Sequence, residues 1–194
     1  MKRQIAREDI MPLDVYGEQR RDLRRRMSET KKTRRLHIGP HAVAHFESFD
    51  TMWYQVQEML YIEKGGDEQL VGELAAYNPL IPNGRELVAT VMFEIEDEDR
   101  RRRFLATVGG VEEVMALDFA GERVKGVPEA DLDRTSADGK ASSVQFVHFP
   151  FTAAQVAKFK APGTQVAFAI EHPNYTHAAV MPEPVRAALA GDFE

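Results

Sequence analysis

Cysteine is absent from this chain of 194 residues. Its absence excludes disulfide bonds, thiolate zinc sites, cysteine-ligated iron–sulfur clusters and a cysteine nucleophile. Electron transfer through an iron–sulfur cluster of its own is therefore excluded as well. Any metal ion, whether iron, manganese or zinc, would have to be bound by histidine and carboxylate side chains.

Long apolar runs are also missing. No stretch approaches the roughly 20 residues that cross a bilayer, and the opening residues MKRQIAREDIMPLD lack the apolar core of a signal peptide. We therefore expect a cytoplasmic protein with no membrane partner.

The common catalytic and nucleotide-binding motifs are missing too. The chain has no GxGxxG after a strand pattern, no GxxxxGK[ST], no HExxH and no GxSxG. Nucleotide-binding proteins and the common hydrolases carry these motifs. The motif search assigns no catalytic residue and leaves open whether the protein is an enzyme.

Apolar residues, by contrast, are plentiful. They make up 43% of the chain and include 11 Phe and 8 Met, which is enough to fill a sizeable core. We expect one domain over residues 1–194, with a basic helical arm (1–33) and an α+β body (34–194). Such a domain should fold alone or as a homo-oligomer.

Charge is unevenly distributed. Residues 1–35 hold 12 Lys and Arg against 6 Asp and Glu, whereas the remainder holds 13 against 25. A basic segment can bind nucleic acid, but no aromatic residue interrupts the run 20–26, and the acidic body would repel phosphate. We expect the basic helix to dock on the protein's own acidic surface or on a partner subunit.

Hydrophobic periodicity and turn residues predict the secondary structure. Strands that follow one another through hairpins and single helices favour an α+β fold. We predict a mostly antiparallel sheet with helices on one face, plus the N-terminal charged helix. The predicted helices cover 13–30, 50–64 with Asp50 as N-cap, 68–76, 97–106 capped by Asp97, 152–160 with a Thr152–Gln155 capping box, and 184–190. The predicted strands cover 36–38, 42–46, 87–95, 111–119, 123–127, 144–151 and 165–170, and the predicted loops cover 77–82, 128–143 and 171–177.

Two groups of histidines carry imidazole side chains, which are common metal ligands. His37, His41 and His45 lie four residues apart, a spacing that on a helix would stack three imidazoles on one face and suit a metal. In the predicted hairpin the ends can be far apart, so a solvated or half-buried role is favoured. His172 and His177 follow a core strand and suit iron, manganese or zinc. An ordinary turn with both imidazoles in water is the alternative, and we favour it.

Glu58 lies on the most aromatic predicted helix, beside Tyr54 and Gln57. A carboxylate among amide and aromatic side chains suits a buried acid or a metal ligand. A surface position or a pair with arginine is the more common outcome, because a buried unpaired carboxylate is costly.

Three strings, YQVQEML (54–60), YNPLIP (77–82) and HPNY (172–175), resemble an uncharacterised bacterial family, the domain of unknown function 3501. The resemblance covers nearly the whole chain. The family has no established activity to transfer. Its members are often encoded beside rubrerythrin-like and iron–sulfur oxidoreductase proteins, which implies a role near redox metabolism or oxidative-stress defence and a redox partner protein.

Three functional hypotheses follow. The favoured one is a non-catalytic accessory protein that binds a partner or ligand; the second is a cysteine-free metal-binding protein or metalloenzyme; the third, nucleic-acid binding by the basic helix, is the least favoured. The candidate binding residues are Tyr54, Gln57, Glu58, Tyr77, Asn78 and Tyr175, and the candidate metal ligands are Glu58, His172, His177 and His45.

Overall fold

The strands form two antiparallel sheets in the computed structural model, which describes residues 2–129 and 139–194. Sheet A has the order β1-β2-β3-β7-β6 and sheet B the order β5-β4-β8-β9. The predicted α+β class with antiparallel strands is therefore confirmed. Sheet A comprises β1 (Arg35–Ile38), β2 (Ala42–Phe46), β3 (Glu86–Phe93), β7 (Val144–Pro150) and β6 (Val127–Pro128); sheet B comprises β5 (Glu122–Lys125), β4 (Met115–Phe119), β8 (Val166–His172) and β9 (Tyr175–Val180).

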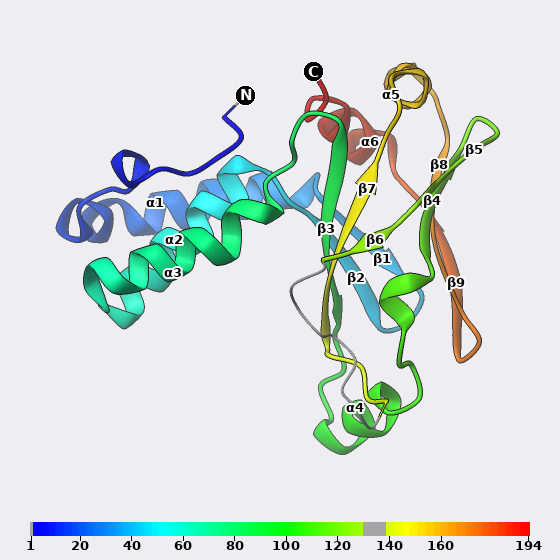
Figure 1. Ribbon diagram of the computed structural model, residues 1–194, viewed down its shortest axis with the longest axis horizontal. Helices are drawn as coiled ribbons and strands as arrows, with labels where there is room; N and C mark the ends of the chain where they lie inside the picture. Colours follow the sequence, from blue (N-terminus) through cyan, green and yellow to red (C-terminus); the bar gives the residue numbers. More distant parts are fainter. Residues whose placement is uncertain (1, 130–138) are drawn as a thin grey trace.

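The molecule has three layers, which are helices, sheet A and sheet B (Figure 1). The two sheets face each other across an apolar core, where the ring of Phe168 in sheet B meets Phe46 and Phe149 in sheet A. Side chains alternate along β3, so Leu87 turns to this core and Val88 turns to the helices. One face of sheet A thus remains available to carry helices and a site.

Helices α1, α2 and α3 lie on the outer side of sheet A, while α4 lies at one end of the sheets and α5 and α6 at the other (Figure 1). Met52, Val56 and Leu60 form the apolar stripe that packs α2 onto the sheet, as helical spacing requires. The bounds are α1 (Leu13–Lys32), α2 (Phe49–Glu63), α3 (Gly66–Tyr77), α4 (Glu98–Leu105), α5 (Ala153–Lys160) and α6 (Glu183–Ala190). Among the described residues, no helix combines the length and the apolar character needed to cross a membrane.

Two of the three predicted helix caps are confirmed and one is wrong. Asp97 caps α4, and Thr152 with Gln155 forms the capping box of α5. The N-cap of α2 is Ser48 rather than Asp50. Ser48 keeps an extended backbone and accepts a hydrogen bond from the Thr51 N–H, whereas Asp50 lies in the first turn, where its charge favours the helix dipole.

The predicted loop over 171–177 is also wrong. This segment is a β-hairpin in which His172 pairs with Tyr175 and Glu171 pairs with Thr176. Only Pro173 and Asn174 form the turn, so Glu171, His172, Thr176 and His177 lie on strands. Of the loop predicted over 128–143, residues 130–138 lie outside the described residues, and Val127–Pro128 pairs with β7.

Basic residues of the N-terminal segment bind carboxylates elsewhere in the protein. Arg20 of α1 pairs with Glu58 of α2 at 2.9 Å, and Arg7 pairs with Asp67 at 2.8 Å. The most buried pair joins Arg34 to Asp192 at 2.5 Å. Arg34 also donates to the backbone carbonyls of Phe46 and Glu47, so it supports the end of β2.

Candidate functional site

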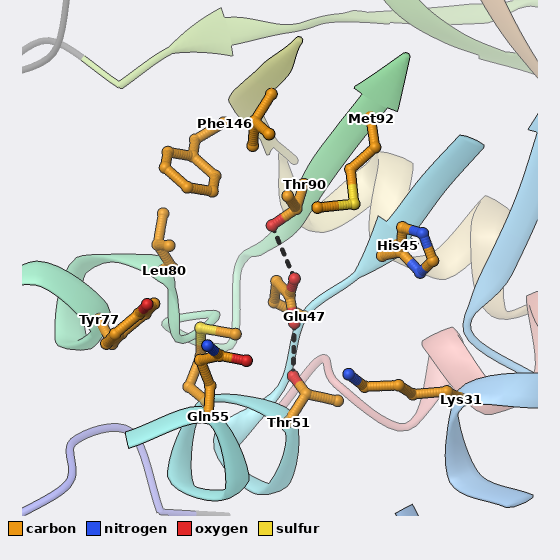
Figure 2. A pocket seen from close by; sticks show the side chains of 12 residues that line it. Lys31, His45, Glu47, Thr51, Gln55, Tyr77, Leu80, Thr90, Met92 and Phe146 are labelled. Carbon is orange, nitrogen blue, oxygen red and sulfur yellow. Dashed lines mark hydrogen bonds between the residues drawn. The ribbon is translucent and has the colours of Figure 1, made fainter. Parts of the chain in front are cut away.

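A cavity of about 300 Å³ lies between the outer face of sheet A and α2, closed at its sides by the last turn of α1 and the end of α3. Its size is at the small end of the range for ligand pockets, roughly 300 to 1,000 Å³. Figure 2 shows Glu47 near its centre, with Lys31 and His45 on one side and Tyr77 and Leu80 on the other. We call this space the Glu47 cavity.

Glu47 directly follows β2 and is only 7% exposed. Its Oε1 accepts a hydrogen bond from the Thr90 hydroxyl and its Oε2 one from the Thr51 hydroxyl, both at 2.6 Å (Figure 2). Burial of a carboxylate is costly unless donors compensate it, and these two hydroxyls do so. A carboxylate has about four acceptor positions, so Glu47 can accept further donors from a bound molecule.

His45 lies two residues before Glu47 and also lines the cavity. Burial lowers the pKa of its imidazole, although the nearby Glu47 and Glu94 carboxylates oppose that effect. The ring is therefore uncharged at neutral pH. Its Nε2 is buried without a hydrogen-bond partner among the described residues, and the Glu94 carboxylate is 3.7 Å away.

The opposite part of the cavity is apolar. Antiparallel register places Phe146 beside Thr90 and Val144 beside Met92 on the outer face of sheet A. Met52 and Leu80 complete this wall. The cavity thus joins an apolar wall to a polar floor, an arrangement that suits a small organic molecule with a polar head.

Tyr77 is the one predicted binding residue that lines this cavity. Burial raises the pKa of its hydroxyl, and a hydrogen bond with Gln55 counteracts part of that effect. The hydroxyl is therefore protonated at neutral pH and can donate. No sequence motif indicated Glu47, Thr51 or Thr90, although Glu47 continues the face of β2 that carries His45, and that alternation was a usable signal.

Gln57 and Asn78 bind the protein's own N-terminal backbone. The Gln57 amide accepts from the Met11 N–H at 3.0 Å and donates to the Met11 carbonyl at 3.1 Å. The Asn78 amide makes the same two bonds to Ile5, at 2.8 and 3.0 Å. The oxygen and the nitrogen of each amide are thereby both bonded to the protein's own backbone.

Glu58 forms an ion pair between α1 and α2, the alternative that the sequence analysis weighed against a site. It accepts from the Tyr16 hydroxyl at 2.5 Å and from two nitrogens of Arg20 at 2.9 and 3.0 Å. The Arg20 guanidinium lowers the pKa of this carboxyl, with a further contribution from Tyr16. Tyr54, one turn earlier on α2, lines a neighbouring basic pocket instead.

Tyr175 packs against the β1–β2 hairpin and α4, His177 lies beside Gly39 of the hairpin, and His172 lies against the loop that follows α4. The Tyr175 hydroxyl donates to the Ile38 carbonyl and accepts from the N–H groups of His41 and Ala42. His172 Nε2 lies 3.2 Å from the Gly109 carbonyl oxygen. The ring of His177 is 4.5 Å from that of Tyr175.

The candidate metal ligands come from different layers of the fold. Glu58 and His45 belong to α2 and β2, whereas His172 and His177 belong to β8 and β9 of the other sheet. Within residues 2–129 and 139–194, no three His, Asp or Glu side chains are grouped so that they could hold a metal ion. The structure therefore does not assemble the proposed set of Glu58, His172, His177 and His45.

The fold and cavity define an α+β protein with a ligand-sized space between a helix and an antiparallel sheet. The chain belongs to the family described as "Protein of unknown function (DUF3501)", whose model matches residues 4–193. It is similar to a crystal structure of a novel protein of unknown function from Burkholderia pseudomallei K96243, with 37% identity and a TM-score of 0.91 over 98% of this chain and 100% of that one. No curated protein matches the chain significantly.

Proposed function

We propose that this protein is a non-catalytic binding protein that holds a small organic molecule in the Glu47 cavity. The observation that carries the proposal is the buried Glu47 carboxylate on the polar floor of a cavity whose opposite wall is apolar. A ligand with a hydroxyl or amine head would donate to Glu47. Its apolar part would lie against Met52, Leu80 and Phe146.

The lining also has a structural role that a binding test must separate from ligand binding. Thr51 belongs to α2 and Thr90 to β3, so their bonds to Glu47 tie the helix to the sheet. A variant that fills the cavity and leaves these bonds intact is therefore more informative than removal of Glu47. Gln55, partly buried on α2, is suited to this purpose.

Methionine methyl groups report on the cavity directly. Met52 and Met92 line it, whereas Met115 lies in the core between the sheets. In protein labelled with ¹³C at the methionine methyls, octanol or octylamine should shift the Met52 and Met92 resonances and leave Met115 unchanged. Gln55→Trp should abolish these shifts in a folded protein. If neither probe shifts Met52 or Met92 at millimolar concentration, the proposal is wrong.

The resemblance to a family encoded beside redox proteins adds a physiological setting. On that basis we propose that the ligand or a partner protein belongs to redox or oxidative-stress metabolism. A pull-down with the neighbouring gene products, read by native mass spectrometry, tests this setting separately from the cavity.

A further inference from the structure

A second pocket, of about 360 Å³, opens beside the Glu47 cavity. It lies where the last two turns of α1 pass β1 and β2. Lys31 and His45 line both spaces, so these two side chains form the boundary between them. We call the second space the basic pocket, and its remaining lining residues are Arg24, Met27, Ser28, Lys32, Arg35 and Tyr54.

The charge of this pocket is strongly positive. Arg24, Lys31 and Arg35 make no ion pair among the described residues, whereas Lys32 is held by Glu29 at 2.7 Å. On the sheet side the Glu94 carboxylate lies 3.7 Å from His45 Nε2, and on the α2 side Arg24 acts on the Glu58 carboxylate. Like charges gathered without partners raise the local concentration of anions.

Tyr54 adds a donor to these cations. Burial and the nearby Glu58 carboxylate raise the pKa of its hydroxyl, so the hydroxyl stays protonated. Arginine, lysine and a phenol together are the donors that bind carboxylate and phosphate groups. The Glu47 cavity has the opposite character, because its floor is a carboxylate.

We propose that the ligand of the Glu47 cavity carries an acidic group, a carboxylate or a phosphate, which binds in the basic pocket past Lys31. This inference rests on the proposed function and narrows it to one ligand class, an organic acid with an apolar body and a hydrogen-bond donor at its far end. The acidic group would lie in the basic pocket and the donor end would lie beside Glu47, on opposite sides of the Lys31–His45 boundary. The Glu47 carboxylate therefore does not repel the acidic group at close range.

The test compares probes that share a tail and differ in the head, namely octanol, octanoate and octyl phosphate. Met27 lines the basic pocket, and Met52 and Met92 line the Glu47 cavity, so the methyl resonances report on each space separately. Both anions should shift all three methyls and bind at least about tenfold more tightly than octanol, as expected for a charge-assisted contact. The stronger of the two anions identifies the acidic group as carboxylate or phosphate.

Two variants separate the pocket from the general charge of α1. Lys31→Gln should remove most of the tenfold preference for anions, and Arg26→Gln should leave it unchanged, because Arg26 lies on α1 but does not line the pocket. Higher salt should weaken octanoate binding and not octanol binding.

Three other outcomes would contradict this inference. Equal affinity for octanol and the anions, with Met52 and Met92 shifted and Met27 unchanged, would overturn this inference and leave the proposed function standing. Shifts of Met27 alone would mean that anions bind apart from the cavity, which also overturns it. If no probe shifts any of the three methyls, both the inference and the proposed function fail.

Discussion

Gln57 holds the backbone of Met11 with both ends of its amide, in the pattern of a single β-bridge. Asn78 holds Ile5 in the same way, and the Trp53 indole N–H donates to the Asp9 carbonyl at 2.9 Å. Two residues from the strings that resemble the family therefore fix the N-terminal segment across α2 and α3. The amides of Gln57 and Asn78 therefore stabilise the fold. They bind the protein's own backbone and not the ligand that the sequence suggested for them.

The first prediction concerns this amide. Gln57→Glu replaces the donating NH₂ with an oxygen that faces the Met11 carbonyl, at a residue with 0% exposure. The free energy of unfolding should fall by about 2 to 3 kcal/mol, because a buried polar group loses its partner. Urea unfolding measures the change. Gln19→Glu, the same substitution on the exposed side of α1, should stay within about 0.5 kcal/mol, and an equal loss in both variants would contradict the assignment.

The second prediction compares two glycines with similar positive φ angles. Gly39 has φ +68° and Gly66 has φ +70°, but a Cβ at Gly39 would lie 2.5 Å from the His177 ring, whereas nothing lies within 4 Å at Gly66. Gly66→Ala should cost about 1 to 2 kcal/mol, the strain of a left-handed alanine. Gly39→Ala should cost about 1 to 3 kcal/mol more, because it adds overpacking.

Thermal or urea unfolding of the glycine variants gives both values. The double variant Gly39→Ala with His177→Ala should recover the overpacking part of the loss. Absence of any recovery would show that the His177 ring does not limit this turn.

The third prediction concerns the Glu58 ion pair. Glu58→Ala leaves the Tyr16 hydroxyl without its acceptor, and Tyr16 is 0% exposed. The free energy of unfolding should fall by about 2 kcal/mol. In that background Tyr16→Phe should cost less than in the native protein, by roughly 1 kcal/mol, and a double-mutant cycle in urea measures the difference. Additive losses would mean that the two side chains are not coupled.

The fourth prediction concerns pH. His148 lies between two carboxylates, with Nδ1 3.1 Å from Glu86 and Nε2 2.8 Å from Glu129. The hydrogen bond with Glu86 is the largest cause that raises the pKa of His148, and the bond with Glu129 adds to it, while burial opposes both. The protonated ring is thus favoured in the folded protein.

The raised pKa of His148 sets the direction in which stability changes with pH. A raised pKa in the folded state contributes stability that is fully present below the unfolded histidine pKa of about 6.5 and is lost as pH rises through the folded value. His148→Gln should remove this part of the pH dependence in urea unfolding. An imidazole that titrates at or below about 6.5 in an NMR titration would contradict the prediction.

Local patterns were sufficient for most of the secondary structure. The alternation around Gly39 and Pro40 predicted the β1–β2 hairpin, and the Thr152 and Gln155 pair predicted the start of α5. These features depend on neighbours within a few residues. The hairpin between β8 and β9 was missed because Pro173 and Asn174 signal a turn without specifying its length.

The site could not be predicted in the same way, because it is assembled by pairing between distant strands. Thr90 meets Glu47 only because β2 lies beside β3 in a particular register. Polar residues on the aromatic-rich helix α2, such as Gln57 and Glu58, attracted the functional interpretation instead. Their partners, Met11 and Arg20, are 46 and 38 residues away, and no local pattern reveals those contacts.

The Arg34–Asp192 pair has a consequence for how the protein is synthesised. Arg34 supports the carbonyl of Glu47, yet its buried charge is neutralised by a residue 158 positions further along the chain. Closing a contact of such long range costs more chain entropy than closing the β1–β2 hairpin. A nascent chain can therefore form the β1–β2 hairpin and α2 before Asp192 has been synthesised, and the Arg34 charge beside the Glu47 carbonyl is neutralised only when the segment that carries Asp192 docks.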